Sequence, residues 1–227
     1  MKKIIMIITF LFLLYSCWDK KIESINNIEN TGSEKITENI GDENNLEELK
    51  ILALWDSLTA WYSLDIQDSY PYKLQEIFKT NWYNYEIINA WVSWDTSKNL
   101  LSRLSLYEDD YKIVLLNIWW NDWLRSLSLE ELESNIIKII EKFEESKIVL
   151  FSIDLPFNYW PKYRKELKWV YENINKEKNI YFYWLFFEWL DYNEHFLPDW
   201  LHPNKSGYKI ISENIYNYLL ENDLINN

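Results

Sequence analysis

The chain has 227 residues, of which 48% are hydrophobic and 18% aromatic, so it is long enough for one domain with a sizeable core. Its net charge of −13, from 36 acidic against 23 basic side chains, argues against a nucleic-acid partner, because phosphates would be repelled. Two histidines and one cysteine are too few to build a metal site at the usual ligand spacing, and the sequence predicts no cofactor.

The N-terminus has the form of a secretory signal. Two lysines precede an apolar run over residues 4–15, which is too short for a membrane-spanning helix. The string LYSC, ending at Cys17, resembles a bacterial lipoprotein processing box, which implies that Cys17 is acylated and holds an exported protein at a membrane, on the cell surface or the periplasmic side. The alternative is an ordinary signal peptide with an incidental cysteine. We expect a signal peptide over residues 1–17, a disordered tether over 18–47 and a folded domain over 48–224.

From Lys50 onward, short β-rich runs alternate with longer amphipathic ones, a pattern typical of a parallel sheet with crossover helices. The third and fourth predicted strands are almost continuously apolar, which indicates burial on both faces. The five predicted strands span residues 51–54, 85–89, 112–118, 147–153 and 180–183.

Five helices are predicted between and after these strands. The first has Pro71 in its first turn, the second carries leucines on one face, and Ser128 with Glu131 forms a capping box at the start of the third. They span residues 71–80, 96–107, 128–145, 163–175 and 205–220. The order predicts an α/β protein, a three-layer α/β/α sandwich with a five-stranded parallel sheet of flavodoxin-like type, in which sites lie outside the carboxyl ends of the strands.

Four strings follow predicted strands or stand near the C-terminus: WDSLTAWY at 55–62, NAWVSWDT at 89–96, WWNDW at 119–123 and DWLHP at 199–203. With glycine in place of each tryptophan they read GDSLTAGY, NAGVSGDT, GGNDG and DGLHP, the block motifs of the SGNH (GDSL-type) hydrolases. The chain therefore resembles this family over about residues 50–220. The string LPFNYW at 155–160 also resembles the LPxNYG segment of its bacterial thioesterase/lysophospholipase (arylesterase) branch. The resemblance implies the SGNH hydrolase fold and serine esterase activity.

The tryptophans are a systematic departure from the family pattern. The chain has 3 glycines and 14 tryptophans, whereas globular proteins average about 7% glycine. Tight strand-to-helix turns need residues that tolerate positive φ and close backbone approach, as glycine does and tryptophan does not. We hypothesise that the gene uses UGA as a glycine codon that has been read as tryptophan. The alternative is a genuinely tryptophan-rich protein that stacks sugars on its indoles, and Trp169, inside a predicted helix, can be a true tryptophan in either case.

A serine hydroxyl becomes a nucleophile only when a base removes its proton, and the chain offers two histidines as the base. The resemblance assigns Ser57 as nucleophile, with Asp199 and His202 completing the triad. Asp199 stands three residues before His202, close enough to accept from Nδ1. His195 has no such carboxylate in a motif and is interpreted as a loop histidine. Without the other strings, Ser57 would be interpreted as a helix cap.

The resemblance also implies an oxyanion hole made by the backbone N–H groups of Ser57 and Trp94 and by the side chain of Asn121. Taken alone, Asn121 could be a turn asparagine at a strand end. An indole at position 94 would project into the pocket that holds the acyl group or the oxyanion. The chain with tryptophan at this position is therefore predicted to be poorly active or misfolded.

These assignments predict hydrolysis of a carboxylic ester or thioester through an acyl-Ser57 intermediate, with water as the second acceptor. The substrates that the resemblance implies are lysophospholipids, short acyl esters and acyl thioesters, and a membrane anchor favours the first. One alternative keeps the site and makes the protein a carbohydrate O-deacetylase. The other is a non-catalytic surface lipoprotein that binds carbohydrate or lipid through exposed tryptophans.

Overall fold

The computed structural model describes residues 48–54, 64–107, 110–152, 161–184 and 186–226, which belong to one compact unit. Within these ranges the chain forms a five-stranded sheet with the order β2-β1-β3-β4-β5, and every pair is parallel. This is the strand order of a doubly wound flavodoxin-like sheet, so the predicted fold class is confirmed. The strands are β1 (Leu49–Leu54), β2 (Tyr85–Asn89), β3 (Ile113–Leu116), β4 (Lys147–Phe151) and β5 (Tyr181–Tyr183).

The apolar runs of the sequence form the centre of the sheet. All four residues of β3 are buried, and so are the last four of both β1 and β4, whereas the edge strands β2 and β5 are mostly half-buried. Strands β3 and β4 are shorter than predicted, because the ladder of paired residues ends at Leu116 in β3 and at Phe151 in β4. The predicted end of the fourth strand, Ile153, lies outside the described residues.

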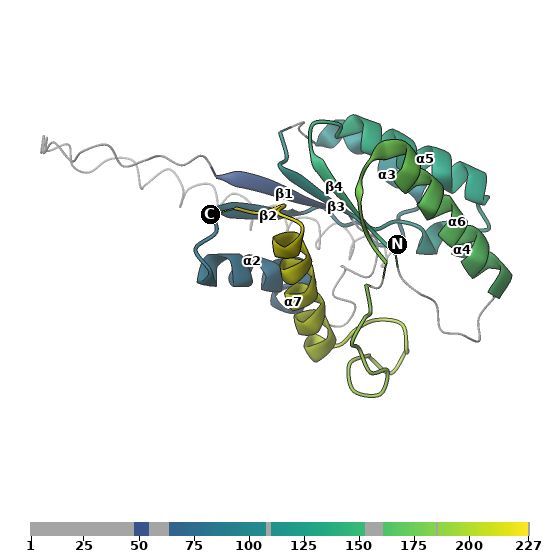
Figure 1. The fold of residues 1–227 in the computed structure, drawn as a ribbon. Coiled ribbons are helices and arrows are strands. Elements are labelled where there is room, and N and C mark those ends of the chain that lie inside the picture. The colour runs from purple at the N-terminus through teal and green to yellow at the C-terminus, as the bar shows by residue number, and fades with distance from the viewer. Residues whose placement is uncertain (1–47, 55–63, 108–109, 153–160, 185, 227) are drawn as a thin grey trace, which may run out of the picture. The chain divides into compact units, whose positions relative to one another are not determined.

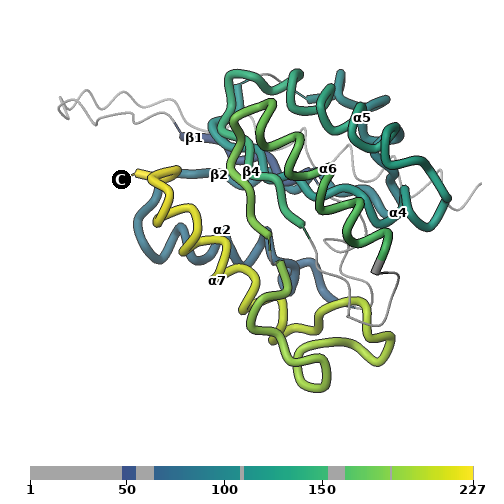
Figure 2. Tube along the Cα trace, turned by 45° about the vertical axis from the view of Figure 1, so that its right-hand side comes forward, coloured from purple at the N-terminus to yellow at the C-terminus, as the bar shows by residue number. Residues whose placement is uncertain are grey.

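Helices cover both faces of the sheet and make the three layers that the sequence predicts (Figure 1). Helices α2 (Tyr70–Thr80) and α7 (Lys205–Glu221) pack together on one face. On the other face α5 (Leu129–Lys142) packs against both α3 (Ser97–Ser102) and α6 (Pro161–Lys178). The segment between β5 and α7 loops out beyond the N-terminal end of α7 (Figure 2).

The predicted helix over residues 96–107 is wrong as one continuous element. Helix α3 ends at Ser102, Arg103 leaves helical geometry with φ −108° and ψ 5°, and a 3₁₀ turn, η2 (Leu104–Leu106), follows. Two short elements were not predicted, η1 (Ile66–Asp68) and α4 (Trp120–Leu124), because neither is long enough to show a helical period. The predicted cap of α5 is present, since the Ser128 hydroxyl accepts the Glu131 backbone N–H at 3.1 Å.

None of the helices in the described ranges is long and apolar enough to cross a membrane. Residues 1–47, with the predicted signal peptide, Cys17 and the whole of the predicted tether, lie outside the described part of the chain.

Candidate active site

Three of the sequence motifs follow strands whose carboxyl ends are adjacent in the sheet. The register pairs Ala53 of β1 with Asn89 of β2, and Leu54 of β1 with Leu116 of β3, so the carboxyl ends of these three strands are adjacent. The motif strings over residues 55–62, 89–96 and 119–123 follow these ends. Ser57, the rest of its string and the whole string over 155–160 lie outside the described residues.

The Asp199 carboxylate binds both the ring and the backbone of the His202 loop. Its Oδ2 lies 2.7 Å from Nδ1 of His202, and its Oδ1 accepts the backbone N–H groups of Leu201 and His202, each at 3.0 Å. His202 is buried, with 8% of its surface exposed. The sequence predicted this contact from the spacing of the two residues. Because the carboxylate fixes Nδ1, the proton-accepting position left to the ring is Nε2.

Opposing effects set the charge of Asp199. Partial burial by itself would raise the pKa of this carboxyl, but hydrogen bonds from the His202 backbone, the His202 ring and the Leu201 backbone outweigh it and hold the pKa below its usual value. Asp199 is therefore ionised at neutral pH. An ionised carboxylate at this position stabilises a positive charge on the His202 ring.

His195 has a different environment from His202. Its Nδ1 accepts the backbone N–H of Asp191 at 2.8 Å, and its own backbone N–H donates to the Asp191 carbonyl. Its carbonyl accepts the N–H of Asn204, the residue that caps α7. These bonds close the loop that precedes the His202 segment, in agreement with the interpretation of His195 as a loop histidine.

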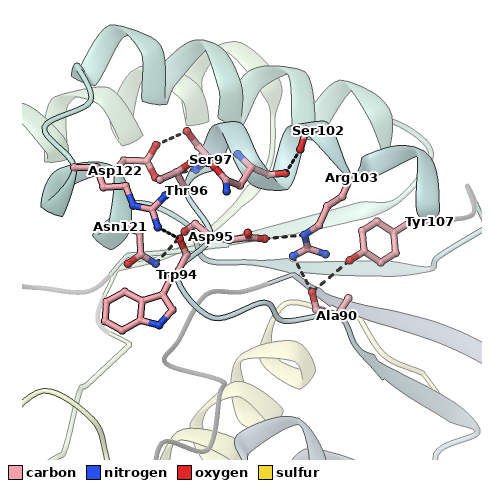
Figure 3. A network of polar contacts seen from close by, with 12 residues as sticks. Ala90, Trp94, Asp95, Thr96, Ser97, Ser102, Arg103, Tyr107, Asn121 and Asp122 are labelled. Carbon is pink, nitrogen blue, oxygen red and sulfur yellow. Dashed lines mark hydrogen bonds and ion pairs between the residues drawn. The ribbon is translucent and has the colours of Figure 1, made fainter. Parts of the chain in front are cut away.

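Two predicted oxyanion-hole residues, Trp94 on the loop after β2 and Asn121 in helix α4, belong to segments that are hydrogen-bonded to each other (Figure 3). The Asn121 side chain, 1% exposed, donates one N–H to the Asp95 carbonyl at 2.9 Å. The Trp94 carbonyl accepts from Arg125 Nη2 at 2.9 Å, and among the described residues no hydrogen bond uses the Trp94 backbone N–H. One N–H of Asn121 and the N–H of Trp94 therefore remain as donors.

Two further contacts hold these segments, and the sequence did not predict either. Arg103 donates to the Asp95 carboxylate at 2.7 Å and to the Ala90 carbonyl at 3.0 Å (Figure 3). Asp122, 1% exposed, accepts the Ser97 backbone N–H at 2.8 Å and also the Ser97 hydroxyl. Asp95 and Asp122 stand inside the motif strings, so the sequence could have marked them as candidate site residues. Nothing in the sequence pattern singles out Arg103.

Ser97 also links this network to α5. The Asn135 side chain donates to the Ser97 hydroxyl at 3.0 Å, and Asn135, Ser97 and Asp122 are all buried.

Burial raises the pKa of the Asp122 carboxyl, and the hydrogen bonds from Ser97 offset only part of that effect. In the described part of the chain, no three side chains of the metal-binding types are grouped so that they could hold an ion.

The fold and this edge of the sheet define the class of protein. Residues 53–210 match the model of the GDSL-like lipase/acylhydrolase family, so the chain belongs to that family. It is a serine hydrolase of carboxylic esters.

The chain is similar along most of its length to proteins named as esterases. The chain is 28% identical over 171 residues to esterase TesA of Pseudomonas aeruginosa, covering 73% of this chain and 85% of the relative. It is 29% identical over 169 residues to an arylesterase of Vibrio mimicus, covering 72% and 84%. Among solved structures, TesA gives a TM-score of 0.68 at 27% identity and covers 75% of this chain and 97% of that one. The esterase EstA from Pseudoalteromonas sp. gives the same TM-score at 27% identity, covering 76% and 97%.

Proposed function

We propose that Ser57, His202 and Asp199 form the catalytic triad of this esterase. The observation that carries the proposal is the 2.7 Å contact between His202 Nδ1 and Asp199 Oδ2 on a loop beyond the carboxyl ends of the strands. In the sequence, Ser57 comes three residues after the last residue of β1, within the string that resembles the nucleophile motif of the family. This part of the proposal rests on the sequence motif.

The triad performs the reaction in two halves. Nε2 of His202 takes the proton of the Ser57 hydroxyl as its oxygen attacks the acyl carbon, and the imidazolium gives that proton to the leaving alkoxide or thiolate. Water then attacks the acyl-Ser57 ester, again with His202 as base, and releases the carboxylic acid. The ionised Asp199 keeps the ring in one tautomer and stabilises its positive charge in both halves.

Negative charge develops on the carbonyl oxygen during each attack. The donors available to it are the backbone N–H groups of Ser57 and residue 94 and the second N–H of Asn121. Because the first Asn121 N–H is already bonded to the Asp95 carbonyl, the amide is held in place before the substrate binds. Such preorganisation is what makes a neutral donor effective for catalysis.

For substrates, we propose short acyl esters, acyl thioesters and lysophospholipids, with a lipid anchor at Cys17 that holds the exported enzyme at a membrane. The sequence of residues 1–17 and the relatives named as an esterase and an arylesterase support this proposal. An anchored enzyme meets single-chain lipids at the membrane surface, which favours lysophospholipid. The structural neighbours that act on carbohydrate esters are 19% and 21% identical, so their likeness concerns the fold alone and does not favour the deacetylase alternative.

The test is hydrolysis of p-nitrophenyl acetate and butyrate by the recoded chain, defined as the chain with glycine at the tryptophans of the four motifs. These are Trp55, Trp61, Trp91, Trp94, Trp119, Trp120, Trp123 and Trp200. We expect turnover that disappears with Ser57→Ala while the melting temperature stays unchanged. A folded recoded chain without Ser57-dependent turnover on these esters or on acyl thioesters would favour the binding lipoprotein instead.

A further inference from the structure

Four tryptophans have a backbone conformation that tryptophan rarely adopts. The described residues include seven non-glycine positions in the left-handed region, and the tryptophans among them are Trp82, Trp94, Trp189 and Trp200, with φ of 62°, 67°, 70° and 57°. The other three are Ser126, Asn179 and Asp223, whose side chains are short and polar. A bulky residue in this region is an outlier, whereas glycine enters it without steric cost.

Trp82 occupies the position that glycine most often takes after a helix. Helix α2 ends at Thr80, the N–H of Trp82 donates to the Lys79 carbonyl at 3.3 Å, and the N–H of Tyr83 donates to the Phe78 carbonyl at 3.0 Å. The rings of Phe78 and Tyr83 are in contact, with centroids 5.8 Å apart. These are the two bonds and the apolar contact of a Schellman motif, whose left-handed residue is usually glycine.

Trp94 and Trp189 each stand third in a turn. The N–H of Asp95 donates to the Val92 carbonyl at 3.3 Å, and the N–H of Leu190 donates to the Phe187 carbonyl at 3.2 Å. A positive φ at the third position is the mark of a turn that calls for glycine there.

Trp200 is the last residue of a turn that its own N–H closes on the Leu197 carbonyl, and its left-handed backbone lies between Asp199 and His202. The four indoles gain little from burial, since Trp82, Trp94, Trp189 and Trp200 are 90%, 61%, 76% and 59% exposed.

We propose that positions 82, 94, 189 and 200 are glycine in the natural protein, encoded by UGA. Trp82 and Trp189 lie outside every motif, so here the backbone identifies glycine positions independently of the family resemblance. Trp169 is the contrast, because it is 60% exposed inside α6 and has no left-handed backbone. Trp119 is a further indication that a tryptophan stands in place of glycine, because its buried indole N–H has no hydrogen-bond partner within the described part of the chain.

The codons and the peptides decide the natural residue. We expect UGA at codons 82, 94, 189 and 200, and tandem mass spectrometry of the protein from its own cells should show glycine at each position. UGG at these codons, or tryptophan in the peptides, would overturn the proposal.

A stability measurement tests the physical reason. In the full chain, Trp82→Gly and Trp189→Gly should each raise Tm by about 2–4 °C, because they remove the strain of a side chain in the left-handed region. Trp82→Ala removes the same indole but keeps a β-carbon, so it should give less than half of that rise. Trp169→Gly should lower Tm, since glycine is unfavourable inside a helix. Equal effects of glycine and alanine at position 82 would contradict the strain argument.

A second proposal concerns Arg103 and rests on the proposed function. We infer that Arg103 is a positioning residue that fixes the two oxyanion-hole donors of residue 94 and Asn121. Its guanidinium binds the loop over residues 90–95 at both ends, at the Ala90 carbonyl and at the Asp95 carboxylate. The charged side chains of Arg103 and Asp95 are only 15% and 7% exposed, so solvent screens their attraction little.

The contacts continue from this ion pair to both donors. Arg103 binds the carboxylate of Asp95, and the backbone carbonyl of Asp95 accepts an N–H of Asn121. Residue 94 directly precedes Asp95 in the chain. The Tyr107 ring lies against the guanidinium, 5.4 Å from ring centroid to Cζ, and its hydroxyl also donates to the Ala90 carbonyl at 3.4 Å. A displaced guanidinium would therefore free the loop that sets the direction of both N–H groups.

Arg103→Met tests the inference in the recoded chain, with Lys178→Gln as the matched control. Lys178 makes an ion pair of the same 2.7 Å length with Glu141 on another part of the surface. For Arg103→Met we expect kcat to fall about 10–100-fold, less than for outright loss of a donor, with KM within about twofold. The Ki of a butylboronic acid, whose tetrahedral adduct places an oxygen in the hole, should rise in the same proportion.

Partial unfolding alone would lower the active fraction but leave that Ki unchanged, so an unchanged Ki would overturn the inference. Hydrogen exchange of residues 90–96 supplies a readout that needs no activity. It should speed up in Arg103→Met and stay unchanged in Lys178→Gln. Unchanged exchange in Arg103→Met also overturns the inference, whereas loss of Ser57-dependent turnover in the parent recoded chain would contradict the proposed function alone.

Discussion

The carboxylate of Asp199 and the ring of His202 are joined at 2.7 Å, and the second carboxylate oxygen is taken by the backbone N–H groups of Leu201 and His202. Both carboxylate oxygens of Asp199 therefore form hydrogen bonds within one loop. The loop cannot change shape without breaking charge-assisted hydrogen bonds, which are stronger than neutral ones. The pair is therefore rigid before the substrate arrives.

Asp199→Asn should lower kcat of the recoded chain by about 10³–10⁴-fold with little change in KM, because an amide that donates to Nδ1 stabilises the wrong tautomer of His202. The measurement is p-nitrophenyl butyrate hydrolysis at neutral pH. Asp191→Asn is the matched control, since Asp191 contacts His195 through its backbone N–H. A loss in Asp191→Asn as large as that in Asp199→Asn would contradict the assignment of His202 as the base.

Sequence patterns predicted the parts of this protein that depend on local, repeated chemistry. The apolar runs gave the central strands within a few residues, and the three-residue spacing of Asp199 and His202 anticipated their contact. The break after Ser102 could not be predicted, because it depends on Arg103 reaching Ala90 and Asp95 on a preceding loop. Periodicity carries no information about such a contact.

The buried polar network shows the same limit. The string WWNDW marks Asn121 and Asp122 as polar residues after a strand, but it does not show that Asp122 binds Ser97, whose hydroxyl also accepts from Asn135. Those partners are 25 and 13 residues away along the chain and meet only when α3, α4 and α5 pack on one face. The sequence pattern therefore singled out Asn121 as a candidate donor and missed the contacts among Asp122, Ser97 and Asn135.

Asp122→Asn should change how stability depends on pH. Burial raises the pKa of Asp122 above its unfolded value of 3.8, so the folded state holds this proton more tightly than the unfolded chain does. The contribution of this group to stability is therefore highest below the unfolded pKa, falls as pH rises through the folded pKa, and stays low above it. Asparagine does not titrate but can still accept the Ser97 N–H.

The measurement is urea unfolding of both chains between about pH 4 and pH 7. The stability of the parent relative to Asp122→Asn should decline as pH rises across this range. Glu144→Gln, at an exposed position just after α5, is the control for a general charge effect. A parent chain that gains stability over Asp122→Asn with rising pH would show that the carboxylate is stabilised, and not penalised, by its surroundings.

Gly207→Ala should destabilise the fold although alanine is the better helix former. A β-carbon at position 207 would collide with the His195 carbonyl oxygen, which is backbone and cannot rotate away. Helix propensity favours alanine by about 1 kcal/mol, and overpacking of this kind costs about 1–3 kcal/mol. We expect a net loss in urea unfolding, with Ser206→Ala, one residue earlier in α7, as the control. A stabilised Gly207→Ala chain would mean that the loop over residues 195–204 moves freely away from the helix.

Asn121→Ala should lower kcat of the recoded chain by about 10²–10³-fold, the usual cost of one lost oxyanion donor. Asn121→Asp keeps the size of the side chain but presents negative charge to the developing oxyanion and to the Asp95 carbonyl, so we expect a larger loss of activity. Asn135→Ala is the control, because it removes another buried asparagine of the same network without removing a donor. Both p-nitrophenyl butyrate turnover and the Ki of butylboronic acid should be measured. If Asn135→Ala raised that Ki as much as Asn121→Ala, Asn121 would act through the packing of the loops and not as a donor to the oxyanion.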